Sequence, residues 1–258
     1  MEPLFIYNLA KLPKGLSNAV KLETLPINKR IVVIAPHSDD VSISCGGTIN
    51  VLARYNKITP VLFFTGYRGV EGETIKQATA IREDEMRKEA KILGIIPPVF
   101  LRLESYDEEN FSIHEEDIIE VENFLIKQNP DIIFLPKKDD AQPRHKLATQ
   151  IILKALRTPY LEREEQTEPT KLFFYESPWS LFSAFEFNSA FFLSNLNLNK
   201  KVRAIKAHTS QLKRTAFDRA TRNLAELRGI TVVEQRMAGY GRNIKNPDKP
   251  YIEVFYTV

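Results

Sequence analysis

Runs of apolar residues alternate with amphipathic stretches along most of this chain. Continuous β-branched and aromatic runs, typical of strands buried on both faces, occur at residues 30–36, 59–65, 98–103, 131–136 and 171–175. Helical patterns follow the first four runs, at residues 44–55, 74–93, 115–127 and 145–156. This alternation predicts βαβ units. We therefore expect an α/β fold with a mostly parallel sheet and helices on both faces, in three layers.

The remaining segments predict the C-terminal part of the fold. Residues 197–229 carry two helical patterns, and residues 251–257 alternate between apolar and polar side chains like a final strand. Residues 160–170 and 239–250 show neither pattern, so we expect loops there. No shift in composition marks a boundary. This predicts one domain over residues 1–258, with its core beginning near residue 30.

The balance of charge excludes some classes of partner. The chain of 258 residues has 36 basic and 33 acidic side chains and a net charge of +3. It therefore lacks the basic footprint of a protein that binds nucleic acid or an anionic membrane. The single cysteine, Cys45, cannot form an internal disulfide, and no apolar run approaches the ~18 residues of a membrane span. We expect a soluble cytoplasmic protein, and we leave assembly into a homo-oligomer open.

Candidate chemistry begins directly after the first predicted strand. In open α/β sheets, ligands bind beyond the carboxyl ends of the strands, where His37, Asp39 and Asp40 lie. His37 and Asp40 can face the same point in a tight turn, with Asp39 rotated away from them. Zinc binds histidine nitrogen and carboxylate oxygen, and catalytic zinc sites keep a position for water. The turn could supply two metal ligands with a general base beside them, although a helix N-cap explains these residues about as well.

A second polar loop follows the fourth predicted strand and ends at His145. Taken alone, His145 is better explained as a residue at a helix start. Together with His37 and Asp40, it completes a set of two histidines and one carboxylate, and metal binding becomes the better interpretation. The same ligand set serves non-haem iron, so the ligands alone do not separate Zn²⁺ from Fe²⁺. Gly46 and Gly47 lack the spacing of a phosphate-binding loop, so a nucleotide-binding protein is the least expected class.

Five motifs in this chain resemble those of the LmbE/PIG-L deacetylase family, and they run from about residue 30 to the C-terminus. They read A-P-H-S-D-D with a later G-G, R-x-x-E with a later A-x-x-L-G, D-A-Q-P-R-H, K-x-x-A-I-x-x-H-x-S-Q, and Y-x-E-x-F. These motifs occupy residues 35–47, 82–94, 140–145, 201–211 and 251–255. Each motif is modestly specific, but five in the right order form a strong resemblance.

The resemblance implies a Rossmann-like (LmbE-like) fold and a zinc-dependent hydrolase. Its activity would be removal of an acetyl or other acyl group from the amide nitrogen of an N-acetylglucosamine-type sugar or glycoconjugate. By the same resemblance, His37, Asp40 and His145 would hold the metal and Asp39 would be the general base.

The resemblance also implies substrate contacts on two other elements. Arg82 would contact the substrate, residues 66–72 would border the pocket, and His208 would either contact the substrate or pack as a buried histidine in the crevice wall. Without the family, Arg82 would be interpreted as a solvated charge on a helix.

Two residues depart from the family pattern. Gln142 stands where the family has a histidine, and its amide can donate a hydrogen bond to an oxyanion but cannot deliver a proton. Arg144 stands where the family has an acidic residue, and it could bind an acidic group of the substrate. The proposed metal ligands and base are present, whereas the histidine that could donate a proton is replaced by Gln142.

These departures keep a rival hypothesis open, in which the protein binds a metal or a sugar but has lost catalysis. An iron oxygenase with the same ligands is disfavoured by the βαβ pattern, because such oxygenases are rich in β-structure. The favoured hypothesis is metal-assisted amide hydrolysis, in which Asp39 takes a proton from zinc-activated water and Gln142 helps to stabilise the oxyanion.

Overall fold

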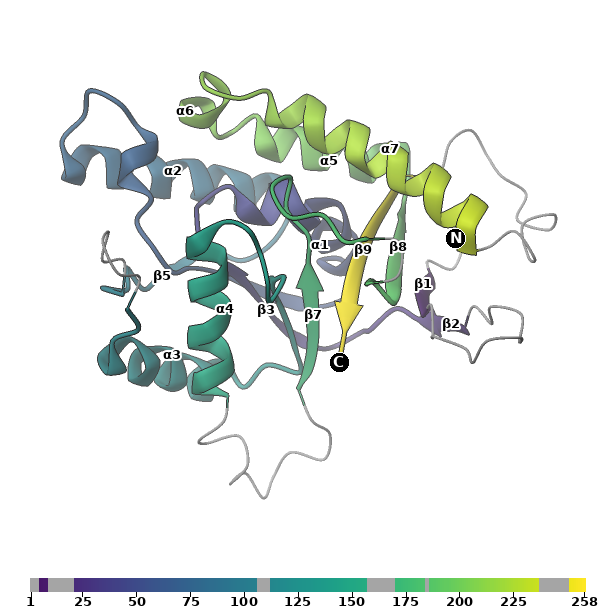
Figure 1. Ribbon diagram of the computed structural model, residues 1–258, viewed down its shortest axis with the longest axis horizontal. Helices are drawn as coiled ribbons and strands as arrows, with labels where there is room; N and C mark the ends of the chain where they lie inside the picture. The colour runs from purple at the N-terminus through teal and green to yellow at the C-terminus, as the bar shows by residue number, and fades with distance from the viewer. Residues whose placement is uncertain (1–4, 9–20, 106–111, 157–169, 184–185, 237–250) are drawn as a thin grey trace.

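A computed structural model describes residues 5–8, 21–105, 112–156, 170–183, 186–236 and 251–258 (Figure 1). In these residues, nine strands form one sheet in the order β2-β1-β8-β9-β7-β6-β3-β4-β5. The strands are β1 Phe5–Asn8, β2 Lys21–Thr24, β3 Arg30–Ala35, β4 Lys57–Leu62, β5 Val99–Phe100, β6 Ile132–Pro136, β7 Lys171–Tyr175, β8 Ser189–Leu193 and β9 Tyr251–Thr257. The longer helices are α1 Gly46–Leu52, α2 Ile75–Leu93, α3 Glu115–Gln128, α4 Pro143–Ala155, α5 Asn195–Ile205 and α7 Phe217–Arg236.

The predicted α/β class with a three-layer arrangement is confirmed, and five of the strands are parallel. Strands β7, β6, β3, β4 and β5 pair in parallel, at positions that the apolar runs predicted. Strands β9, β8, β1 and β2 extend the sheet in antiparallel pairs. Of these four, only β9 was predicted from the sequence. The sheet is therefore mixed, with its parallel half in the segment that carries the candidate chemistry.

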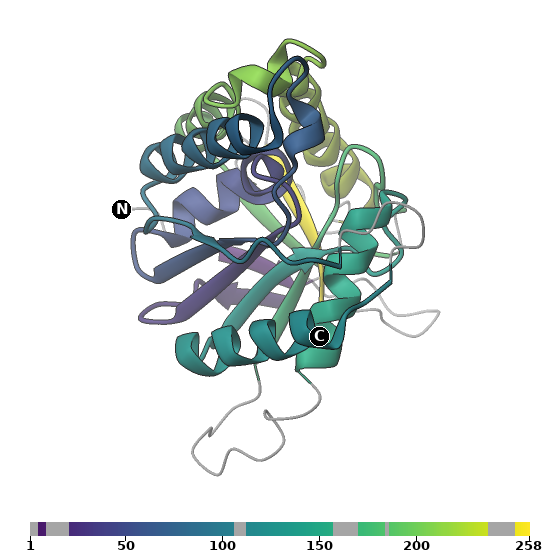
Figure 2. The same ribbon diagram turned by 90° about the vertical axis from the view of Figure 1, so that its left-hand side faces the viewer.

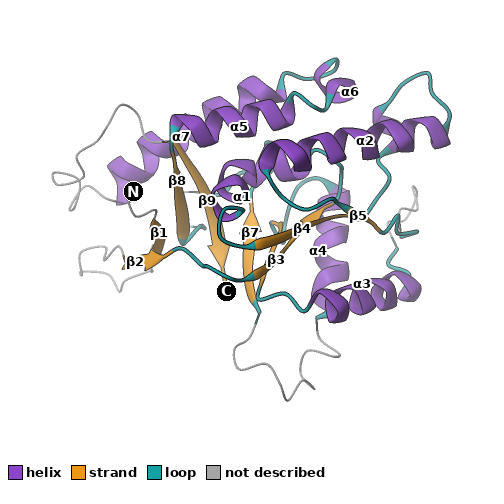
Figure 3. Cartoon of the chain, turned by 180° about the vertical axis from the view of Figure 1, so that it is seen from behind, coloured by secondary structure: helices purple, strands orange, loops and turns teal. Residues whose placement is uncertain are grey.

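Helices cover both faces of the sheet, as Figure 2 and Figure 3 show. Side chains of β3 alternate between two core clusters, with Val32 and Ile34 in one and Ile31 and Val33 in the other. The first cluster is completed by α3, α4 and a residue of α7, and the second by α1, α2 and α5. Because both faces of β3 are buried, its sequence is a continuous apolar run. None of the described helices is long and apolar enough to cross a membrane.

Two helix predictions need correction. Residues 197–229 were expected to form two helices, but the structure has α5, a single turn α6 (Thr209–Leu212) and α7. The break comes at His208, whose backbone (φ −86°, ψ 64°) leaves the helical region. The predicted helix at residues 44–55 begins earlier, with a π-helical turn at Val41–Cys45, and then continues as α1. The loops predicted at residues 160–170 and 239–250 lie outside the described residues, apart from Thr170.

The N-terminus of α1 is completed by a carboxylate from the last strand. Glu253 of β9 accepts hydrogen bonds from the backbone N–H groups of Gly47 and Thr48 (3.1 and 2.7 Å) and pairs with Lys201 of α5 at 2.5 Å. The first N–H groups of a helix have no partner within the helix, so this carboxylate satisfies them. Gly47 is also needed for close packing, because a Cβ there would overlap a methyl carbon of Leu193. Helix α1 is thus fixed against the sheet.

Replacing Lys201 with methionine is expected to lower the free energy of unfolding by about 3–5 kcal/mol, because it leaves Glu253 as a buried carboxylate without its cation. Chemical denaturation of the purified variant measures this loss. Lys206→Met is the matched control, since Lys206 is 58% exposed and its 3.7 Å contact with Asp218 is worth less than about 1 kcal/mol. Equal stabilities of the two variants would show that Lys201 does not stabilise the buried carboxylate of Glu253.

Candidate metal centre and pocket

The candidate site lies where the strand order of the sheet reverses. Strands β3 and β6 are parallel neighbours, with Val32 opposite Ile133. From β3 the chain continues outward to β4 and β5, and β6 returns on the other side of β3. The carboxyl ends of two such strands leave a crevice between the loops that follow them, which is the usual ligand site of this architecture. The segments 36–40 and 137–145 both begin at this crevice.

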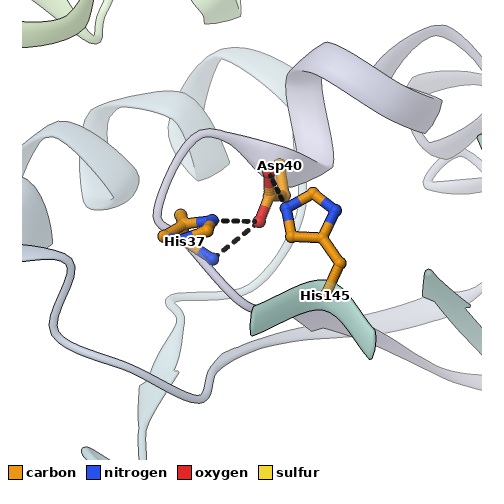
Figure 4. A group of neighbouring side chains, drawn as sticks. All are labelled: His37, Asp40 and His145. Carbon is orange, nitrogen blue, oxygen red and sulfur yellow. Dashed lines mark hydrogen bonds and ion pairs between the residues drawn. The ribbon is translucent and has the colours of Figure 1, made fainter. Parts of the chain in front are cut away.

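The turn after β3 brings His37 and Asp40 together as the sequence predicted. The Asp40 carboxylate accepts a hydrogen bond from the backbone N–H of His37 at 2.6 Å and lies 3.2 Å from its Nδ1. The helical cap alternative fails for Asp40, because its side chain makes no capping hydrogen bond to the helical turn that follows. Its carboxylate instead faces the crevice between the histidines (Figure 4).

His145 reaches the same carboxylate from the first turn of α4. Its Nε2 lies 3.2 Å from the second oxygen of Asp40, and its side chain is fully buried. Its other ring nitrogen, Nδ1, lies 3.1 Å from Asp140, which also accepts a hydrogen bond from Ser177. A histidine held through one nitrogen by a carboxylate, with the other nitrogen facing a shared point, is the usual arrangement of a metal ligand.

These three side chains fit a divalent metal. One ligand atom from each of His37, Asp40 and His145 lies within 4.8 Å of the others. Burial alone would lower the pKa of His145, but Asp40 and Asp140 raise that pKa to about 10. Burial would raise the pKa of Asp40, yet the two histidines hold it far below its usual range. The cluster therefore favours a positive charge at its centre, and the buried Nε2 of His145, although 3.2 Å from Asp40, makes no well-oriented hydrogen bond.

Asp39 is not one of the three clustered side chains, and it pairs with Arg82 of α2 at 2.8 Å. Burial acts to raise the pKa of Asp39, but Arg82 together with His208 and His37 lowers that pKa below its usual value. Arg82 is 2% exposed and lines the pocket, so its interpretation as a solvated helix charge is wrong. The pair places an ionised carboxylate beside the candidate metal centre.

Gln142 caps α4 and turns its amide nitrogen toward the metal centre. Its side-chain oxygen accepts hydrogen bonds from the backbone N–H groups of Arg144 and His145 at 2.5 and 3.1 Å. With the oxygen engaged in this way, its NH₂ group lies 3.3 Å from Nε2 of His37. The helix start is therefore supplied by Gln142, which leaves the ring of His145 available to the site.

A pocket of about 390 Å³ opens over the cluster. His37, Asp39 and Asp40 line it, together with Gly66 and Gly69 from the loop at residues 66–72 that was expected to border it. The volume lies in the range of small-molecule sites. The candidate residues of the segments 36–40 and 137–145 thus line one cavity.

His208 is not among the residues that line this pocket. It is 1% exposed, and its ring nitrogens lie 3.9 Å from Glu85 and 3.6 Å from Glu89. Burial acts to lower the pKa of His208, but Glu89 and Asp39 together raise it above its usual value. Of the two interpretations of His208, this position fits the buried histidine of the crevice wall.

Sequence reasoning did not identify several residues at the site. Asp140 was quoted only as part of a motif, and its position five residues before His145 gave no sign that it holds that ring. Trp179 is 48% exposed and contacts His145 edge to face, with ring centroids 6.0 Å apart. Arg68 and Arg214 also line the pocket. The only signal for Trp179 was a lone tryptophan in a segment that follows a predicted strand.

Comparisons with known proteins were made with this geometry in hand. Residues 32–156 match the family model described as PIG-L: GlcNAc-PI de-N-acetylase. The fold is similar to that of the N,N'-diacetylchitobiose deacetylase from Pyrococcus horikoshii, with 20% identity, 89% of this chain and 84% of that chain covered, and a TM-score of 0.69.

Two further solved structures share this fold. One is the conserved protein TT1542 from Thermus thermophilus, with 21% identity, coverages of 88% and 94%, and a TM-score of 0.67. The other is GalB, the 4-carboxy-2-hydroxymuconate hydratase from Pseudomonas putida, with 18% identity, coverages of 89% and 96%, and a TM-score of 0.70. Because a deacetylase and a hydratase both share it, the fold alone does not select the reaction.

Proposed function

We propose that the protein is a metal-dependent N-deacetylase, because residues 32–156, which hold three of the five motifs, match the PIG-L family model. Its substrate would be an N-acetylglucosamine-type sugar or glycoconjugate. The observation that carries the proposal is the convergence of His37, Asp40 and His145 within 4.8 Å of one another at the floor of a pocket. We further propose that the whole chain forms one domain, which the continuous sheet from β2 to β5 supports.

In this proposal, His37, Asp40 and His145 hold Zn²⁺ or another divalent ion such as Fe²⁺. The bound metal would supply Lewis-acid activation of water and of the amide carbonyl. Asp39 accepts the proton of the attacking water, and its pairing with Arg82 keeps it ionised and correctly turned. Asp140 holds the ring of His145 in place.

Gln142 takes the role of an oxyanion donor. Because its oxygen is bound by the first turn of α4, its NH₂ group is directed toward the reacting centre and donates to the developing negative charge. An amide holds no proton to release at neutral pH, so the proton for the leaving amine comes from Asp39, which took it from water. One carboxylate thus serves both proton transfers.

The sugar specificity rests on the aromatic wall of the pocket. Trp179 is half-exposed, packs against Phe217 with ring centroids 5.4 Å apart, and contacts His145 of the metal cluster. An exposed aromatic face beside a polar cavity is suited to the apolar face of a sugar ring. The Pyrococcus horikoshii protein, whose fold is similar, is a deacetylase of an N-acetylated disaccharide.

A second candidate is a metal- or sugar-binding protein without catalysis. Gln142 and Arg144 favour it, since they replace the histidine and the acidic residue of the family motif. Both candidates predict a metal at the same three residues, but only the enzyme predicts release of acetate.

We expect the purified protein to release acetate from N-acetylhexosamine glycosides and to lose this activity on chelation. Removal of the metal with a chelator should lower the rate by at least about 10³-fold, and added Zn²⁺ should restore it. Acetate release and metal content are measured on the same samples, with heat-denatured protein as the blank. A metal-loaded protein that releases no acetate from a broad panel would favour the binding protein.

A further inference from the structure

Gln211 of α6 lines the pocket, and the proposed mechanism gives it no role. The residue is mostly buried, with 9% of its surface exposed. Its backbone is fixed by the turn that begins at His208, because the N–H of Gln211 donates to the carbonyl of His208 at 3.0 Å. Gln211 therefore joins the pocket wall from an element separate from those that carry the metal ligands.

Both protons of the Gln211 amide nitrogen have partners within the protein. Nε2 donates to the backbone carbonyl of Gly69 at 2.9 Å and to the hydroxyl of Ser210 at 3.0 Å. The Ser210 hydroxyl donates its own proton to Glu85 at 2.7 Å, so it accepts from Gln211. A flipped amide would place its oxygen against the Gly69 carbonyl, where neither atom has a proton to share. These contacts therefore fix the orientation of the amide plane.

The amide oxygen, Oε1, is the part of Gln211 that remains available to a ligand. No described residue donates a hydrogen bond to this oxygen, and it is open to solvent. An amide oxygen has two lone pairs, so it offers a preset acceptor at the pocket wall. A ligand that covers the oxygen without supplying a donor would leave it unpaired, which weakens binding.

Gly69 leaves the space that this arrangement requires. A Cβ on Gly69 would lie 2.9 Å from Nε2 and 3.2 Å from Oε1 of Gln211, and its three nearest heavy atoms would all belong to that side chain. The φ of Gly69 lies outside the left-handed region, unlike those of Gly66 and Gly72, so the backbone does not require glycine here. The close approach of Gln211 is thus the physical reason for a glycine at this position.

The chemistry of the proposed substrate makes a hydroxyl group the partner of this oxygen. In the proposed complex, the N-acetyl group of the sugar lies at the metal centre. The remaining hydrogen-bond donors of the sugar are its hydroxyl groups. A phosphate or a carboxylate holds no proton to donate at neutral pH, so neither would satisfy the acceptor.

We propose that Gln211 is a specificity-determining residue, whose amide oxygen accepts a hydrogen bond from one hydroxyl group of the bound sugar. Gly69 and Ser210 are its positioning residues, since they hold the amide nitrogen. This inference rests on the proposed function and specifies how the same site recognises its sugar.

The test compares the methyl glycoside of N-acetylglucosamine with its 3-deoxy, 4-deoxy and 6-deoxy analogues, each of which lacks one hydroxyl group. Calorimetric binding is measured in the zinc-loaded Asp39→Asn protein, which holds the ligand unhydrolysed, and kcat/KM is measured with native Asp39. Each background is combined with Gln211→Met, which keeps the length of the side chain but offers only a weak acceptor, and with Gly69→Ala. Gln150→Met is the matched control, since Gln150 is exposed on α4 and does not line this pocket.

With Gln211 in place, we expect one deoxy analogue to bind about three- to tenfold more weakly than the parent glycoside, as a single hydrogen bond provides. Gln211→Met should weaken binding of the parent by the same factor and abolish its difference from that analogue. Gly69→Ala should have the same effect, because its Cβ displaces the amide. Gln150→Met should preserve the difference.

Three results would overturn the inference. They are equal binding of all four sugars (or of none) with Gln211 in place, a difference that survives in Gln211→Met, and an equal weakening of all four sugars by Gln211→Met. The last is the result expected of a merely structural role. If Gln211→Met does not fold, Gly69→Ala decides, because it displaces the same amide from the opposite side of the contact.

These readouts separate the inference from the proposed function. Loss of affinity for one deoxy analogue that depends on Gln211, without acetate release from any sugar, would refute the deacetylase and support the role of Gln211. Acetate release with the same kcat/KM from all four sugars would support the deacetylase and refute the role of Gln211.

Discussion

His145→Ala is expected to remove the metal and to lower the rate of acetate release by at least about 10³-fold. The imidazole of His145 is fully buried between Asp40 and Asp140, at 3.2 and 3.1 Å. No other described histidine besides His37 takes part in the cluster, so no further imidazole replaces the lost ligand. Loss of a Lewis acid costs several kcal/mol of transition-state stabilisation, which corresponds to three or more factors of ten. Metal analysis and initial rates measure both effects.

The control for this variant is His114→Ala, which makes the same change at the start of α3, where the histidine side chain forms no capping hydrogen bond. Removing His145 also takes away one partner from each of two buried carboxylates, Asp40 and Asp140, so circular dichroism must verify that the variant is folded. His145→Gln, which keeps a polar side chain at this position, supports the interpretation if alanine unfolds the protein. A folded variant that retains one equivalent of metal would refute the metal centre.

Asp39→Asn is expected to keep the metal and to lower kcat by about 10²–10⁴-fold, the usual contribution of a general base. Asparagine has the shape of aspartate and can still accept the hydrogen bond from Arg82, but it cannot take a proton from water. Metal content and kcat are measured together. Replacing a metal ligand lowers the metal content, whereas replacing a general base leaves it unchanged.

Asp84→Asn is the matched control, since Asp84 is 56% exposed on α2 and pairs only with Lys88 among the contacts described there. A drop of less than tenfold in kcat for Asp39→Asn would exclude Asp39 as the base. Loss of metal in this variant would instead assign Asp39 to the metal centre.

The parallel half of the sheet and the ligand set could be predicted because both depend on local sequence. The apolar run at Arg30–Ala35 is continuous because both faces of β3 are buried, and the turn that follows places His37 beside Asp40 within three residues. The role of His145 needed one additional step, the expectation that the carboxyl ends of parallel strands meet at one edge. That step holds because β3 and β6 are neighbours.

The rest depended on contacts that the sequence does not encode locally. Strand β8, at Ser189–Leu193, is preceded by other aromatic residues, so its apolar run had no clear boundary. Asp140 was not recognised because its contact with His145 depends on the path of the chain into α4. Arg68 and Arg214 meet at the pocket only after segments about 150 residues apart have packed together.

The carboxylate of Glu253 also bears on the order in which the protein can be made. It bonds to Thr48 across 205 positions of the chain, at the helix that follows the metal-binding turn. A nascent chain on the ribosome must therefore hold that helix end without its partner until the final strand has been synthesised. Contacts this distant in sequence slow folding, because the loop between them must close first. The start of α1 is thus fixed against the sheet only after β9 has been synthesised.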